Sequence, residues 1–159
     1  MAAFAITEFG KLLGGCLFIL DRSKMLQGVF TMDPLKLRYT KTHEWAAIEG
    51  NICTVGLTKF AVDLLTDVIY IDMPDVGDPA LKGDSFGEIE SVKAVSDIYA
   101  PVDGEIVEVN DKLVQDPAAI SKDPFGKGWL VKIKMSGKPN LDHLMNHAAY
   151  EKQIASESH

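Results

Sequence analysis

The chain is organised around the stretch GEIESVKAVSDIYAPVDGEI, residues 87–106, whose centre is Lys93. Short alternations of apolar with polar or small residues run on each side of this lysine, over residues 86–91 and 95–100. A period of two is typical of strands, so the stretch predicts two strands joined by a turn that carries Lys93. A lysine in an exposed turn stays protonated near neutral pH and is a poor nucleophile, but it is open to an enzyme that acylates its amine.

The residues around Lys93 resemble the lipoylation motif of glycine cleavage system H proteins. The resemblance rests on ESVKAVSD at 90–97 and APVDGEI at 100–106, and it continues in KTHEW at 41–45 and DPFGKGW at 123–129. It therefore covers Leu35 to about Tyr150. A single surface lysine is ordinarily a solvated residue without a role. The length of the match favours a modified lysine instead.

Length and composition are those of an ordinary globular protein. The 159 residues fit one domain, with 47% hydrophobic and 25% charged residues. Acidic residues outnumber basic ones by 23 to 16, and the net charge of -7 argues against a nucleic-acid-binding surface. The two cysteines, Cys16 and Cys53, lack CxxC spacing and are too few for a disulfide framework. A reducing compartment is therefore expected.

Residues 1–31 differ from the rest of the chain and have no match to the family. Their apolar run is broken by Glu8, Lys11 and Asp21, so it predicts no membrane span, and no basic region precedes it as in a signal peptide. We expect residues 1–31 to be an extension, either disordered or upstream of a true start at Met32, and residues 32–159 to be the carrier domain. The expected location is the bacterial cytoplasm. The mitochondrial matrix is the alternative.

Between Leu35 and Asn110 the pattern is rich in strands. A glycine turn at 49–51 joins the strands predicted over 45–48 and 52–57 into a hairpin. Thr58 is placed to cap a short helix, whose apolar residues at helical spacing are Phe60, Ala61, Leu64 and Leu65. Further strands are predicted over 67–73 and 105–109. The tripeptide Gly-Glu-Ile occurs at both 87–89 and 104–106, which is weak evidence for a repeat.

The last fifty residues predict a long polar loop, one strand and one helix. The loop covers 110–128, and alternation over 129–135 predicts the strand. An amphipathic pattern after Asn140, a plausible cap, predicts a C-terminal helix on which His143 and His147 share a face. Many short strands and few helices indicate a mainly β sandwich or flattened barrel. The resemblance implies a barrel-sandwich hybrid of two small antiparallel sheets.

The resemblance implies that Lys93 carries lipoate in amide linkage, attached by a lipoyl or octanoyl transferase or a lipoate ligase. The lipoyl group would carry the aminomethyl group of glycine among three enzymes. These are the pyridoxal-phosphate (PLP) glycine decarboxylase, the tetrahydrofolate-dependent aminomethyltransferase and the FAD enzyme dihydrolipoamide dehydrogenase. The chain itself would be a monomeric carrier without catalytic residues, because the cofactors perform the hard chemistry.

The motif residues that flank Lys93 are candidates for recognition by these enzymes, through charge complementarity where they are acidic. For Glu90 a recognition role and a solvated sheet face both remain open, whereas for Glu88 and Asp97 the solvated face is favoured. The candidate recognition residues are Glu90, Ser91, Val92, Ala94 and Asp97.

The resemblance also implies that Glu44 lines the cleft that receives the loaded arm. Many family members have histidine at the position of Leu64 and glycine at that of Thr66. Leu64 would shield the arm without bonding its amine, or it would be a core residue of the short helix; both interpretations remain open. Trp45 is expected to be a buried anchor. His43 and Glu44 are adjacent with no third ligand at suitable spacing, so no metal site is predicted.

Other classes of protein fit the sequence less well. Methionines commonly flank the lysine of biotinyl carriers, whereas Val92 and Ala94 do so here. A lipoyl domain of a 2-oxoacid dehydrogenase usually lacks the KTHEW segment and the C-terminal helix. A relay that passes acyl groups to other lipoyl proteins remains open. The sequence contains no phosphate loop and no GxSxG elbow, so it does not favour an enzyme.

Overall fold

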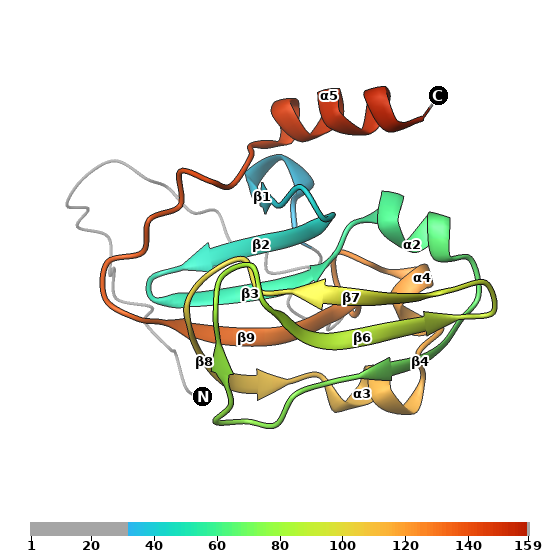
Figure 1. Cartoon of the computed structure of the whole chain (residues 1–159), viewed down its shortest axis with the longest axis horizontal. Helices are drawn as coiled ribbons and strands as arrows, with labels where there is room; N and C mark the ends of the chain where they lie inside the picture. The colour runs from blue at the N-terminus through green and yellow to red at the C-terminus, as the bar shows by residue number, and fades with distance from the viewer. Residues whose placement is uncertain (1–31, 159) are drawn as a thin grey trace, which may run out of the picture.

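The computed structural model describes residues 32–158, which form two antiparallel sheets (Figure 1). The mainly β fold with two antiparallel sheets is therefore confirmed, while the predicted extension over 1–31 lies outside the described residues. The six-stranded sheet has the order β1 (Arg38–Tyr39), β2 (Glu44–Glu49), β3 (Ile52–Leu57), β9 (Trp129–Met135), β8 (Gly104–Val109) and β5 (Pro79–Ala80). The three-stranded sheet has the order β4 (Val68–Asp72), β6 (Ser85–Ser91) and β7 (Val95–Tyr99).

Five short helical segments connect or cover the strands. They are η1 (Pro34–Lys36), α2 (Lys59–Leu65), α3 (Asp111–Gln115), α4 (Ala119–Lys122) and α5 (His147–Glu157). The predicted cap of α2 is confirmed, because the Thr58 side chain accepts from the Ala61 N–H. No helix among residues 32–158 is long and apolar enough to cross a bilayer.

Helices α3 and α4 lie where the sequence predicted a long polar loop, so that prediction was wrong. Each helix buries a single apolar side chain, Leu113 in α3 and Ile120 in α4. Helices of one turn show no apolar period in the sequence, because one buried residue does not repeat. Tertiary packing of those two side chains fixes both helices.

The C-terminal helix is confirmed, but its predicted cap was wrong. The helix begins at His147, and the side-chain amide oxygen of Asn146, Oδ1, accepts from the Ala149 N–H at 2.8 Å. Asn140 instead accepts from the Asp142 N–H at 2.9 Å, which forms a turn before the helix.

The late start of α5 also separates the two histidines that were predicted to share a helix face. His143 precedes the helix, and its Nε2 lies 2.6 Å from the Pro101 carbonyl oxygen. His147 is the first residue of the helix and pairs with Glu151 at 3.3 Å. The two side chains therefore contact different parts of the molecule.

The main core lies between the two sheets. Its fully buried members come from both sheets. Each strand turns every second side chain toward this core, which explains why apolar and polar residues alternate along the strands. From the three-stranded sheet they include Ile71, Ile89 and Ile98, and from the six-stranded sheet Val55, Ile106 and Ile133.

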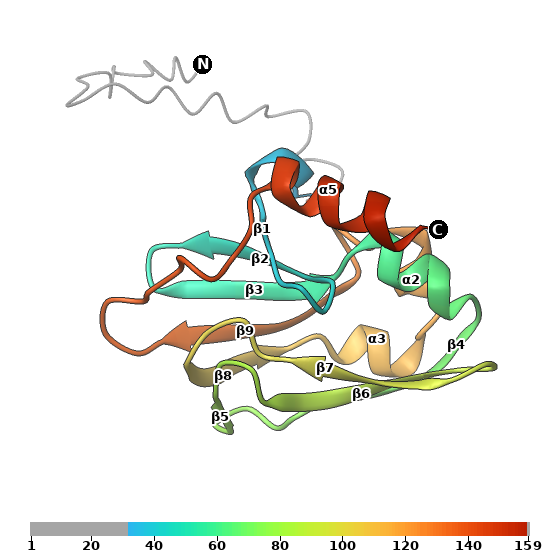
Figure 2. The same ribbon diagram turned by 45° about the horizontal axis from the view of Figure 1, so that its top comes forward.

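A second, smaller core lies under α5, beside β1 and β2 (Figure 2). Trp45 is fully buried there, as predicted, and its indole N–H donates to the Pro124 carbonyl at 3.0 Å. Tyr150 of α5 stacks on Tyr39 of β1 with the ring centroids 4.5 Å apart. The C-terminal helix is thus fixed to the six-stranded sheet by aromatic packing.

One Gly-Glu-Ile tripeptide lies inside β6 and the other begins β8 in the other sheet, and their glycines have the same steric role. A side chain on Gly87 would meet the Asp72 carbonyl oxygen, and one on Gly104 would meet the Lys134 carbonyl oxygen. A neighbouring strand thus approaches the backbone closely at each glycine. The echo in the sequence reflects this shared packing requirement.

Candidate functional site

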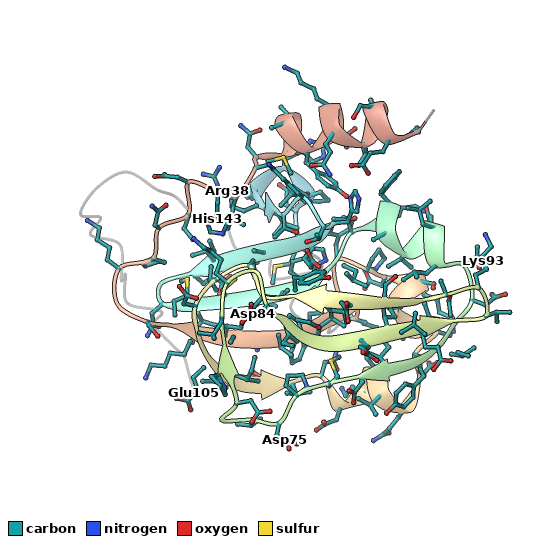
Figure 3. The ribbon with its side chains drawn as sticks, in the orientation of Figure 1. Arg38, Asp75, Asp84, Lys93, Glu105 and His143 are labelled. Atoms are coloured by element: carbon teal, nitrogen blue, oxygen red, sulfur yellow. The ribbon has the colours of Figure 1, made fainter. Side chains whose placement is uncertain are left out.

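Lys93 lies at the tip of the β6–β7 hairpin, at the end of the three-stranded sheet (Figure 3). The predicted turn position is confirmed. The last strand pair before the turn is Glu90 with Val95, and the Ser91 N–H donates to the Ala94 carbonyl at 2.8 Å. Lys93 is exposed, and its ammonium group forms no ion pair within residues 32–158. Its amine is free for covalent attachment.

Ser91 organises the turn. Its side chain is buried, and its hydroxyl oxygen accepts from the Lys93 N–H at 3.2 Å and the Ala94 N–H at 3.1 Å. The Val92 N–H donates to the Asp67 carbonyl at 3.1 Å, which ties the turn to the link between α2 and β4. The turn that presents Lys93 is therefore held both by the Ser91 hydroxyl within it and by the Asp67 carbonyl beside it.

The outer face of the three-stranded sheet carries the acidic residues that flank Lys93. Glu88 and Asp97 are exposed and Glu90 is half-buried, and along β6 the two glutamates alternate with buried residues such as Ile89. Cross-strand register aligns them with residues of β4 that the sequence did not single out. One row consists of Tyr70, Glu90 and Val95, and the next of Asp72, Glu88 and Asp97.

Glu44 is completely buried at the start of β2. One carboxylate oxygen accepts from the Tyr99 N–H at 3.1 Å, and the other accepts from the hydroxyls of Thr40 and Thr42. These three partners line a hollow of about 420 Å³. The carboxylate thus lies behind the wall of this hollow.

Glu44 and Lys93 are not brought together. Tyr99 is six residues from Lys93 along β7, and at strand rise this separates the hollow from the turn by about 20 Å. A group on Lys93 would have to lie back along β7 to reach the hollow. The role of Glu44 in holding a loaded arm stays a prediction.

Leu64 is not a core residue. Its side chain is exposed on α2, whereas Val62 and Leu65 face the core. The interpretation of Leu64 as a core residue of the short helix was therefore wrong, and its role in shielding a loaded arm stays a prediction. The departure at Thr66 has a backbone consequence, because this residue adopts φ 63°, a conformation that favours glycine.

His43 contacts the C-terminal helix. Its Nδ1 lies 2.9 Å from the Tyr150 hydroxyl and its Nε2 lies 3.0 Å from the Glu157 carboxylate.

In the part of the chain that the structure describes, no three side chains of His, Cys, Asp or Glu gather in a metal-binding group. Burial raises the pKa of the Cys53 thiol to about 12, which makes this thiol unreactive near neutral pH.

Comparison with known proteins decides the family. The family model for the glycine cleavage H-protein matches residues 37–157, which include the Lys93 hairpin, Glu44 and α5. The chain belongs to the glycine cleavage H-protein family. The match excludes the first 36 residues.

Curated H-proteins and a solved H-protein structure are similar to the chain. The glycine cleavage system H protein of Carboxydothermus hydrogenoformans is 46% identical over 124 residues, covering 78% of this chain and 95% of that protein. The H protein of Thermotoga maritima is 49% identical over 120 residues, covering 76% and 97%. The crystal structure of the H protein from Mycobacterium marinum superposes with a TM-score of 0.70 at 38% identity, covering 77% of this chain and 99% of that one.

Proposed function

We propose that this H-protein family member carries lipoate on Lys93 and moves the aminomethyl group of glycine among the enzymes of the glycine cleavage system. The observation that carries the proposal is the exposed Lys93 at a hairpin tip, inside the matched motif. The alternative of a lipoyl domain or relay serving 2-oxoacid dehydrogenases is not favoured, because the relatives at 46–49% identity are glycine cleavage H proteins.

The residues of the hairpin fit a covalent lipoyl group. The Ser91 hydroxyl fixes the backbone of the turn, so the lysine stem begins at a defined point and leaves the protein surface. The bound lipoyl group supplies a disulfide that is reduced as it accepts the aminomethyl group. Ser91, Val92 and Ala94 keep the turn in place, and Glu90 and Asp97 present charge beside it.

The chain acts as a carrier subunit and supplies no catalytic side chain in this proposal. Its partners are the decarboxylase with PLP, the aminomethyltransferase with tetrahydrofolate, and dihydrolipoamide dehydrogenase with FAD. The relatives named above are bacterial, which supports a cytoplasmic location. We further propose that the carrier is a monomer, because an exposed Lys93 tip has to reach several enzymes in turn.

The test is intact mass and peptide mapping after incubation of the unmodified chain with a lipoate ligase, lipoate and ATP. We expect one lipoyl group per chain, on Lys93, and none on Lys93→Arg. Lys82→Arg, a change of another exposed lysine, serves as the matched control and keeps the modification. Lys93→Arg retains the melting temperature of the native chain but supports no glycine decarboxylation. An adduct on Lys82, Lys112 or Lys122 contradicts the assignment.

A further inference from the structure

Several large apolar side chains around the Lys93 turn are exposed to solvent. Their exposed fractions are large for such residues, and they come from α2, β4, the turn and β7. A group of exposed apolar side chains of this kind marks an interaction site more often than a bare surface. This apolar collar consists of Leu64 (60% exposed), Ile69 (53%), Tyr70 (52%), Val92 (70%) and Val95 (59%).

The collar residues come from elements that lie next to one another. The bond from the Val92 N–H to the Asp67 carbonyl holds the turn against the link between α2 and β4. Tyr70 and Val95 lie in one cross-strand row, with Glu90 between them. Figures 1 and 2 both show the link from α2 to β4 passing beside the tip of the β6–β7 hairpin.

An acidic row lies directly behind the collar. Asp72, Glu88 and Asp97 are exposed and opposite one another on β4, β6 and β7. None of them forms an ion pair with any residue of the described range 32–158. Like charges opposite one another destabilise a sheet, so this arrangement does not serve folding. Strand rise puts the row about 13 Å from the tip, well within one protein footprint.

The geometry of Lys93 decides which partner covers this surface. The unmodified lysine stem has five single bonds and reaches roughly 6 Å. An enzyme that acylates Lys93 must bring its acyl donor within that distance, so it has to cover the collar. Enzymes that act later meet a longer arm and have no such requirement.

We propose that the apolar collar and the acidic row together form the docking surface for the enzyme that attaches lipoate to Lys93. That enzyme meets the collar with the apolar rim of its acyl-chain pocket and meets the acidic row with lysine or arginine residues. The inference rests on the proposed lipoylation of Lys93.

The reaction at this surface uses an acyl-adenylate, which the ligase makes from lipoate and ATP with release of pyrophosphate. The deprotonated Lys93 amine attacks the acyl carbon, and a C–N amide bond forms as the bond from the acyl carbon to the AMP oxygen breaks. AMP leaves, and the proton of the amine passes to solvent.

The charge test compares two variants with the same change in net charge. One is Asp72→Asn, Glu88→Gln, Asp97→Asn in the acidic row. The control is Asp75→Asn, Glu105→Gln, Asp142→Asn, whose exposed carboxylates lie elsewhere; Figure 3 shows Asp75 and Glu105 away from Lys93. Initial rates of adduct formation on Lys93 are measured with purified lipoate ligase, lipoate and ATP. The acidic-row variant is expected to lose about tenfold in kcat/KM at low salt and much less at about 1 M salt, where the Debye length is about 3 Å.

The apolar test compares Val92→Ser, Val95→Ser in the collar with Val76→Ser, Leu81→Ser at equally exposed positions. The collar variant is expected to lose about tenfold in kcat/KM at every salt concentration, with an unchanged melting temperature, while the control keeps the native rate. If the native chain is modified on Lys93 but both test variants behave like their controls, the docking surface is wrong. If the native chain is not modified on Lys93, the proposed function itself fails.

Discussion

The Lys93 end of the three-stranded sheet and the α5 end of the six-stranded sheet use similar residues in opposite ways. At the α5 end Tyr39 and Tyr150 are buried and stacked. At the Lys93 end Tyr70 is half-exposed and Asp97 faces solvent. The first set of side chains stabilises the fold, whereas the second remains free for partners. The comparison predicts that mutations at the two ends affect different measurements.

The buried polar side chains around Tyr150 at the α5 end are paired. The Tyr150 hydroxyl lies 2.7 Å from the Thr58 hydroxyl and 2.9 Å from the His43 ring, which also pairs with Glu157. The Gln153 amide donates to the Lys41 carbonyl at 2.8 Å. Such a satisfied network fixes α5 in one position.

The largest expected effect distinguishes the two ends by stability. Trp45→Ala removes a fully buried ring and its bond to Pro124, so we expect it to lower the free energy of unfolding by about 3–5 kcal/mol. Tyr70→Ala removes an aromatic ring of the outer face and is expected to cost less than about 1 kcal/mol. Urea denaturation followed by fluorescence and circular dichroism measures both. Equal losses would refute the division of roles between the two ends.

The second effect is a loss of stability at alkaline pH that originates at the α5 end. Burial raises the pKa of both Tyr39 and Tyr150 to about 12, above their usual value of 10.0. Between these values the folded chain keeps protons that the unfolded chain releases. The free energy of unfolding therefore falls as pH rises from 10 to 12, by about 2 kcal/mol for each tyrosine.

The variants Tyr39→Phe and Tyr150→Phe test this origin. Each is less stable than the native chain at neutral pH, because Tyr39 loses its bond to the Pro34 carbonyl and Tyr150 its bonds to Thr58 and His43. Each is also expected to lose less stability than the native chain between pH 10 and 12. Urea denaturation at both pH values measures this difference. A native chain of constant stability over this interval would show that the buried phenols do not control it.

Local sequence patterns predicted strands and helices at both ends of the molecule. They did not predict the strand register or the first residue of α5, which depend on long-range contacts. The period of two marked β6 and β7 around Lys93, and the Thr58 cap marked α2. Nothing local reveals that Asp72 of β4 lies opposite Glu88, since register is set by the whole sheet. The start of α5 was misjudged because Asn140 and Asn146 are both good caps, and packing of Tyr150 selects the second.

Two residues other than glycine have positive φ within residues 32–158, and they lie in different settings. His43 has φ 74°, and its ring is held by Tyr150 and Glu157 at the α5 end. Thr66 has φ 63° between α2 and β4, and its hydroxyl donates only to the carbonyl of its neighbour Leu65, at 2.6 Å. The contacts of His43 compensate for its strain. Thr66 has no comparable compensation.

The smallest expected effect is therefore a gain in stability from Thr66→Gly. A β-branched residue at positive φ costs about 1–3 kcal/mol, and glycine removes this strain. Glycine also gives the unfolded chain more freedom, which costs about 0.5–1 kcal/mol, so the net gain is about 1 kcal/mol. Thr66→Ser removes the branch but keeps a side chain at this φ, and it should gain less. His43→Gly also relieves positive φ, yet it should lose stability because the contacts with Tyr150 and Glu157 disappear. Thermal and urea unfolding of the three variants gives the order, and a Thr66→Gly chain less stable than the native one would show that Thr66 is not strained.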